Sequence, residues 1–280
     1  MEKNSSEIRI PTEAFNTLYL EGIGCLHRKS FDTFDPQGEC QEEALRLCRA
    51  IADGTKGQKP AHNRIVLLTG GSGIGKTHLL KATANGVIGP IPTRGEVDRT
   101  AVERSTGMVF FGRSADTFLT AGILDGNFSG WGDISLKVGG MGKFYLPGLT
   151  HALGVSVKYG GGYGVEDKKT ASPSFVLLTP GTHRLVLLDD LGQFTLNKDG
   201  TINPRYLDQI REAVRGLALL AESCYEEGKT ALMVTSNLTL QQITDVAANP
   251  AQASRLQLIK EVPMGDAGAR DFRTTPREDS

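Results

Sequence analysis

Eight consecutive residues in the first third of the chain have the types and spacing that bind phosphate. Residues 70–77 read Gly-Gly-Ser-Gly-Ile-Gly-Lys-Thr and match the phosphate-loop pattern G-x-x-x-x-G-K-[ST]. The backbone N–H groups of such a loop converge on phosphate oxygens, Lys76 reaches the β- and γ-phosphates, and Thr77 offers its hydroxyl to Mg²⁺. The pattern therefore predicts a site for a nucleoside triphosphate and Mg²⁺. The residues that we assign to nucleotide binding are Gly70, Gly71, Ser72, Gly73, Ile74, Gly75, Lys76, Thr77 and His78.

The segments on either side of this loop are those that a phosphate site requires. Residues 64–69 form a short apolar, β-rich run typical of a buried parallel strand, and residues 78–84 can run as a helix until Gly86. The helix adds the positive end of its dipole to the loop. The alternative is an ordinary glycine-rich turn before a helix.

Two acidic residues follow a second apolar run. Asp189 and Asp190 come directly after residues 185–188, so we expect them at the carboxyl end of a buried strand, beside the phosphate loop. There Asp189 would hold the hydration shell of Mg²⁺, and Asp190 would orient or deprotonate the attacking water. The alternative is a pair of acids that begins a loop.

Two later polar residues are candidates to complete the site. Asn237 follows the apolar run 230–235, and its amide can donate to and accept from a γ-phosphate or a water; the alternative is a capping role at a strand exit. Arg255 lies on a predicted helix, where an arginine usually faces solvent. It could instead reach the γ-phosphate of a neighbouring subunit as an arginine finger.

Strands and helices alternate through the main body, which predicts a parallel sheet covered by helices. Ligands of such sheets bind beyond the carboxyl ends of the strands. The expected strands are residues 64–69, 108–111, 185–188 and 230–235, and the expected helices include residues 41–52, 204–227, 240–248 and 252–261.

A glycine-rich insertion interrupts this alternation at about residues 121–182. Its first part, residues 121–164, holds 13 glycines in 44 positions. Lysines and aromatic residues lie among the glycines, including Lys143, Phe144 and Tyr145, and this mixture can follow phosphates and stack on the bases of single-stranded DNA. The alternative is a flexible surface hairpin with solvated charges.

Composition sets broad limits on the function. The 280 residues are 39% hydrophobic, which is enough for a large α/β core, and the net charge of −1 gives no global attraction to nucleic acid. The four cysteines form no C-x-x-C pair, so neither a zinc site nor a disulfide framework is expected. The N-terminus lacks the apolar stretch of a signal peptide, and no run is long enough for a transmembrane helix. We therefore expect a cytoplasmic protein that does not bind membranes.

The chain resembles the AAA+ ATPases of the DnaC-type helicase-loader group, and also their relatives, the IstB-type transposition helpers and the DnaA initiators. The resemblance covers about residues 31–88 and 184–258. Its most specific segments are Gly-Lys-Thr-His-Leu from Gly75 and Leu-Asp-Asp-Leu-Gly from Leu188. The other resembling segments are Phe-Asp-Thr-Phe from Phe31, Tyr-Glu-Glu-Gly-Lys from Tyr225, Val-Thr-Ser-Asn-Leu from Val234 and Ser-Arg-Leu from Ser254.

This resemblance implies a P-loop AAA+ fold, a three-layer αβα arrangement, with ATP and Mg²⁺ as ligands and self-association side by side. It divides the chain into an N-terminal extension (1–30), an ATPase core (31–238) and a small helical lid with a tail (239–280). It implies an ATPase of DNA replication, a helicase loader-like switch acting with a replicative helicase and single-stranded DNA. A transposition helper that delivers a transposase is the alternative, and a small-molecule kinase is less favoured. The roles implied are nucleotide and Mg²⁺ binding for Lys76, Thr77 and Asp189, catalytic acid for Asp190, sensor 1 for Asn237 and arginine finger for Arg255.

Overall fold

The computed structural model describes the parts of the chain that hold the predicted site. These are residues 10–11, 29–57, 63–89, 96–97, 108–111, 115–116, 119, 184–192, 197 and 201–265. The glycine-rich insertion, with its proposed DNA-binding residues, lies outside them. Within the described residues, no helix is both long and apolar enough to cross a membrane.

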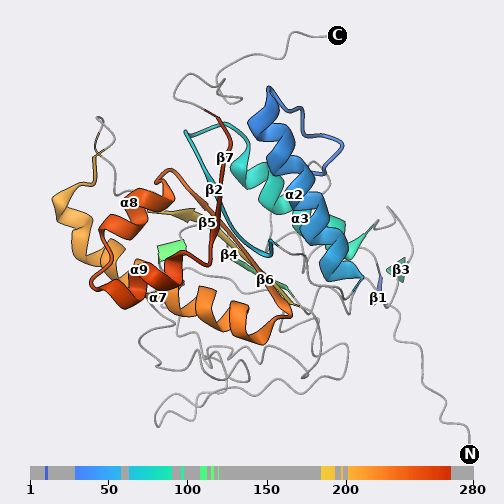
Figure 1. Ribbon diagram of the computed structural model, residues 1–280. Helices are drawn as coiled ribbons and strands as arrows, with labels where there is room; N and C mark the ends of the chain where they lie inside the picture. The colour runs from blue at the N-terminus through green and yellow to red at the C-terminus, as the bar shows by residue number, and fades with distance from the viewer. Residues whose placement is uncertain are drawn as a thin grey trace, which may run out of the picture.

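A five-stranded parallel sheet forms the centre of the molecule (Figure 1). Its strand order is β4-β5-β6-β2-β7, so β6 separates the strand before the phosphate loop from the strand that carries the acidic pair. The strands are β4 (Met108–Phe111), β5 (Arg184–Leu191), β6 (Thr230–Ser236), β2 (Ile65–Thr69) and β7 (Lys260–Pro263). Two further short strands, β1 (Ile10–Pro11) and β3 (Glu96–Val97), pair antiparallel with each other.

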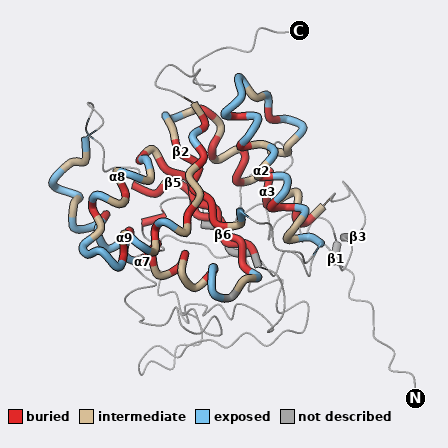
Figure 2. Tube along the Cα trace, viewed as in Figure 1, coloured by how far each residue is buried: buried red, intermediate tan, exposed pale blue. Residues whose placement is uncertain are grey.

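Helices cover both faces of the sheet. Every residue of β2 and β6 is therefore buried. Val66 and Leu68 pack on one face with α2 and α3, whereas Ile65 and Leu67 pack on the other face with α7, α8 and α9 (Figure 2). The predicted three-layer αβα fold is therefore confirmed. The helices are α2 (Glu39–Lys56), α3 (Lys76–Ile88), α7 (Leu207–Glu227), α8 (Leu240–Asp245) and α9 (Pro250–Leu256).

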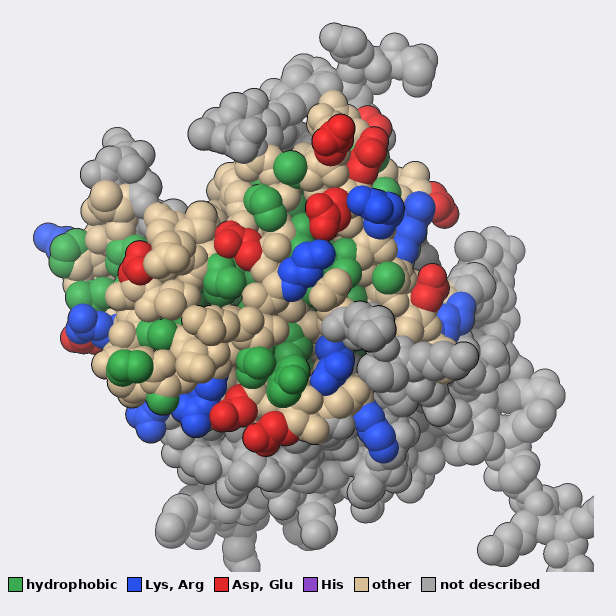
Figure 3. All heavy atoms as spheres, in the orientation of Figure 1, with side chains coloured by type: hydrophobic (Ala, Val, Ile, Leu, Met, Phe, Trp, Pro, Cys, Tyr) green, Lys and Arg blue, Asp and Glu red, His purple; other side chains and the backbone are tan. Residues whose placement is uncertain are grey.

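Charged side chains of both signs lie on the described part of the face that Figure 3 presents. Basic and acidic side chains are interspersed there among hydrophobic ones. This agrees with the net charge of −1. An attraction to nucleic acid would therefore have to be local.

The predicted helix over residues 252–261 is wrong in its second half. The helix α9 ends at Leu256, and Lys260–Pro263 forms the edge strand β7, which pairs with β2. Pro263 lacks a backbone N–H, so it is tolerated at an edge strand that has a neighbour on one side only. The segment that we assigned to the lid thus contributes a strand to the central sheet.

The predicted end of α3 at Gly86 is also wrong, because the helix continues to Ile88. A Cβ atom at Gly86 would lie 2.8 Å from Phe31 Cε2 and 3.0 Å from Ala52 Cβ. The helix thus runs through Gly86, and the missing side chain at this position lets Phe31 and α2 pack closely against α3.

Candidate active site

The predicted phosphate loop connects β2 to α3 and is shaped around one glycine. Gly75 precedes α3 with a φ of 98°, in the left-handed region that favours glycine. A Cβ atom at this position would lie 2.6 Å from Cε2 of Phe34, whose ring is buried. Both the backbone angle and the contact with Phe34 therefore require glycine.

Lys76 lies within this loop, with only 6% of its surface exposed. Its ammonium group donates to the carbonyl oxygens of Gly70 and Gly71, each at 2.7 Å, and to Oδ1 of Asn237 at 2.9 Å. A buried cation is stable only when such acceptors surround it. The lysine thus links the phosphate loop to the end of β6, and the structure brings Lys76 and Asn237 together across 161 residues of sequence.

Asp189 lies beside the other end of the loop and is 2% exposed. Its Oδ1 accepts a hydrogen bond from Thr77 Oγ1 at 3.0 Å and a second from Thr235 Oγ1 at 2.6 Å. The Thr77 hydroxyl and the Asp189 carboxylate are the two predicted Mg²⁺ contacts. They provide the hard oxygen donors that Mg²⁺ takes, so the residues present fit that ion.

Asp190 lies next to Asp189 but in an unusual backbone conformation. Its φ is 57°, in the left-handed region that a residue with a Cβ adopts at a cost, and the pairing of β5 with β6 is irregular between Leu188 and Leu191. Its N–H donates to Thr235 Oγ1 at 2.9 Å. The bulge therefore places two consecutive carboxylates at the end of β5 in different surroundings: Asp189 is buried and Asp190 is partly exposed.

The predicted arginine finger lies on another part of the molecule. Arg255 is on α9, which packs with α7 on the face of the sheet opposite α3. Its Nε lies 2.6 Å from Oε2 of Glu222 on α7. It lines a depression of about 580 Å³ between α7 and α9, together with Arg211 and Arg215. The role of Arg255 in a neighbouring subunit stays a prediction.

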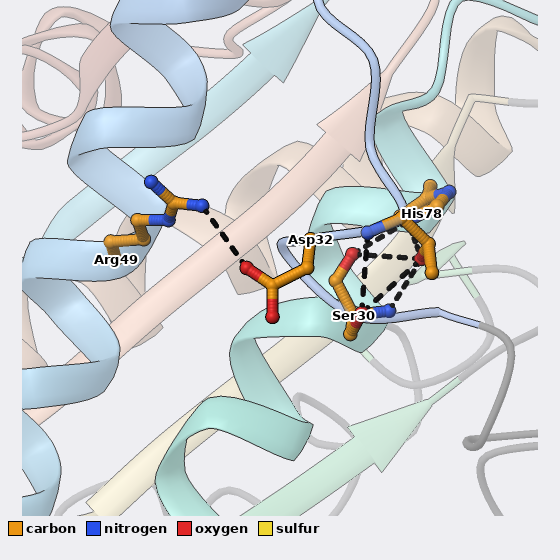
Figure 4. Close-up of polar contacts among 5 residues, drawn as sticks. Ser30, Asp32, Arg49 and His78 are labelled. Atoms are coloured by element: carbon orange, nitrogen blue, oxygen red, sulfur yellow. Dashed lines mark hydrogen bonds and ion pairs between the residues drawn. The ribbon is translucent and has the colours of Figure 1, made fainter.

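The side chain of His78 contacts the segment that precedes α2 (Figure 4). Its Nε2 lies 2.9 Å from the carbonyl oxygen of Ser30 and 3.2 Å from Oγ1 of Thr33, and its ring meets Phe34 edge to face at a centroid distance of 5.3 Å. Its imidazole therefore fixes this segment against the start of α3. The assignment of His78 to nucleotide binding stays a prediction.

Two polar side chains at this end of the sheet have partners that the sequence did not predict. Thr235 contacts both acidic residues. The signal that could have identified it is a hydroxyl at the end of an otherwise apolar strand, because a buried hydroxyl needs a hydrogen-bond partner. Glu261 on β7 accepts from Thr69 Oγ1 at 2.9 Å and from the N–H of Leu240 at 3.1 Å. No signal identified Glu261, because the predicted helix placed it outside the sheet.

Comparison with known proteins yields similarities among solved structures only. No family model matches the chain, and no curated protein matches it. The chain is similar to AMPPCP-bound DnaA from Aquifex aeolicus, with 16% identity and a TM-score of 0.41 over 84% of this chain and 50% of that one. It is also similar to a DNA replication initiation factor, with 16% identity and a TM-score of 0.39 over 84% of this chain and 50% of that one. A third similar structure is DnaI, with 15% identity and a TM-score of 0.38 over 88% of this chain and 92% of that one. The chain thus spans half the length of the first two structures.

We predict that Gly75→Ala destabilises the nucleotide-free protein by roughly 1–3 kcal/mol, because alanine disfavours the left-handed φ and its Cβ meets Phe34. Gly71→Ala is the matched control in the same loop, since no atom lies within 4 Å of a Cβ there. It is expected to change stability by no more than about 0.5 kcal/mol. Denaturant unfolding of both variants measures the difference, and equal stabilities contradict the described loop conformation.

Proposed function

We propose that this chain is an AAA+ protein of DNA replication that binds and hydrolyses ATP and acts as a helicase loader-like switch. The observation that carries the ATPase part is the meeting of two residue pairs at one end of the sheet. Lys76 contacts Asn237, and Thr77 contacts Asp189, although the members of each pair are 161 and 112 residues apart in sequence. These are the types of residue that bind triphosphate and Mg²⁺, and they come from α3, from β5 and from the bend that follows β6.

The proposed hydrolysis assigns different tasks to the residues around the loop. Lys76 would bind the β- and γ-phosphates, while Thr77 and Asp189 would hold Mg²⁺ and its water shell. Asp190 is partly exposed at the end of β5, where its carboxylate could act on a water molecule. Asn237 would contact the γ-phosphate or that water. Mg²⁺, when bound, supplies charge neutralisation at the phosphates.

A neighbouring subunit is proposed to supply the last cation. Arg255 is supported as a finger in trans by its place on α9, because that helix lies on the opposite face of the sheet from α3. It is about two-thirds buried, and its contact with Glu222 fixes the guanidinium group. Such fingers accelerate hydrolysis about 10³–10⁵-fold in known triphosphatases.

The part of the proposal that concerns replication relies on the sequence resemblance of residues 31–88 and 184–258 to the loader group. The proposed partners are a replicative helicase and single-stranded DNA, the latter through the glycine-rich insertion. A transposition helper is the alternative within the same class. A small-molecule kinase would need no second protomer and no DNA, so ATP turnover that rises with protein concentration and with single-stranded DNA would exclude it.

We predict that Asp190→Asn retains ATP binding but lowers the rate of phosphate release about 10²–10⁴-fold, because the amide cannot accept a proton from water. Lys76→Ala is expected to lose ATP binding in addition to hydrolysis, since the loop then lacks the ammonium group that would contact the phosphates. Binding of a fluorescent ATP analogue and phosphate release measure the two effects separately. An Asp190→Asn protein with the wild-type hydrolysis rate would contradict the assignment of the catalytic acid.

We predict that Arg255→Ala and Lys76→Ala, each inactive alone, recover ATP hydrolysis when mixed. The first protein retains an intact nucleotide site, and the second retains the arginine that its neighbour requires. Arg215→Ala, which removes another arginine from the same depression, is the matched control and should hydrolyse ATP alone. A mixture without activity, or an active Arg255→Ala protein, speaks against a finger in trans.

We predict that the Asp190→Asn protein, loaded with ATP and Mg²⁺, retains a replicative helicase in a pull-down. The ATP-bound state persists in this variant because hydrolysis is blocked. Lys76→Ala, which stays without nucleotide, serves as the control and should retain much less. Recovery of a transposase in place of a helicase would replace the loader hypothesis with the transposition helper.

A further inference from the structure

One hydroxyl group in the site contacts both acidic residues. The side chain of Thr235, at the end of β6, is fully buried. Its Oγ1 donates to Asp189 Oδ1 at 2.6 Å and accepts from the N–H of Asp190 at 2.9 Å. A threonine hydroxyl has one donor and two acceptor positions, so both bonds can form at once. The same oxygen therefore fixes the side chain of one acid and the backbone of the next.

The backbone of β5 needs such a contact at this point. The φ of 57° at Asp190 is unfavourable for a residue with a Cβ, and the regular pairing with β6 is interrupted between Leu188 and Leu191. At this irregular point, the N–H of Asp190 donates to the Thr235 hydroxyl at 2.9 Å, which is a side-chain acceptor and not a main-chain carbonyl.

We propose that Thr235 is a positioning residue of the hydrolytic site. It acts through the acidic pair: it holds the Asp189 carboxylate toward Thr77, and it keeps the Asp190 backbone in the conformation that separates the two carboxylates. The inference rests on the proposed hydrolysis of ATP, because only that reaction requires the two acids to have different tasks. It assigns a role in the site to β6 itself, which ends one residue before Asn237.

The chain contains a matched control for this role. Ser236 is the next residue of β6, is also fully buried and also has a hydroxyl with two bonds. Its Oγ donates to the carbonyl oxygen of Leu191 at 2.7 Å and accepts from the N–H of Leu238 at 2.9 Å. Both partners are main-chain groups, and neither belongs to the acidic pair. Loss of this hydroxyl tests the effect of a missing buried hydrogen bond alone.

The first measurement is hydrogen exchange in the protein without nucleotide. In Thr235→Val, which has the same shape without the hydroxyl, the Asp190 amide is expected to exchange about tenfold faster or more. In Ser236→Ala that amide should exchange within about twofold of the wild-type rate. Thr235→Ala repeats the test without the added methyl group, in case Thr235→Val does not fold. Unchanged exchange at Asp190 in the folded variant would overturn the inference.

The second measurement is the Mg²⁺ dependence of ATP hydrolysis. Thr235→Val is expected to lower kcat about tenfold or more and to raise the Mg²⁺ concentration at half-maximal rate, whereas Thr235→Ser and Ser236→Ala keep the wild-type Mg²⁺ midpoint. Binding of a non-hydrolysable ATP analogue without Mg²⁺ should be unchanged, because the described hydrogen bonds of Lys76 go to Gly70, Gly71 and Asn237. An equal loss in Ser236→Ala would instead indicate a general destabilisation of β6 and overturn the inference. Absence of turnover in the wild type contradicts the proposed function, whereas normal turnover in Thr235→Val contradicts this inference alone.

Discussion

The burial of the Lys76 charge is the constraint on which the rest of the site depends. An ammonium group that is 6% exposed must be surrounded by acceptors, and the acceptors here come from two elements. The carbonyl oxygens of Gly70 and Gly71 accept hydrogen bonds from the lysine, which holds the phosphate loop around it. Oδ1 of Asn237 accepts a third hydrogen bond, which connects the residue after β6 to the same ammonium group. The loop and the neighbouring strand are therefore fixed by one charge.

The strand order explains why polar residues lie at the end of β6. Because β6 lies between β2 and β5, the acidic pair reaches the phosphate loop only across the end of β6. A purely apolar end there would leave the Asp189 carboxylate with Thr77 as its single described partner. Thr235 supplies a second hydroxyl at 2.6 Å, and Asn237 supplies an amide to Lys76 on the other side. Polar residues at the end of this central strand thus follow from the topology.

The sequence predicted the parts of the molecule that are set by local patterns. The apolar runs that became β2, β5 and β6 are buried on both faces, so their composition alone identified them. The fixed spacing of the phosphate loop identified Lys76 and Thr77 in the same way. Features that depend on distant neighbours were not predictable: Phe31 leaves no room for a side chain at Gly86 inside α3, and Lys260–Pro263 is a strand because β2 offers a free edge. The φ of Asp190 and the partners of Glu261 likewise depend on contacts across the sheet.

These contacts also define a physical path from the phosphate loop to Arg255. A phosphate group that takes over Lys76 has to displace its present acceptors, and one of them is Asn237. Two residues later, Thr239 caps α8 with a capping box, so Asn237 lies directly before the first turn of that helix. Glu261 holds the same turn to Thr69, the last residue before the loop. Since α8 packs on α9, the charge on Lys76 and the position of Arg255 are joined through a short series of described contacts.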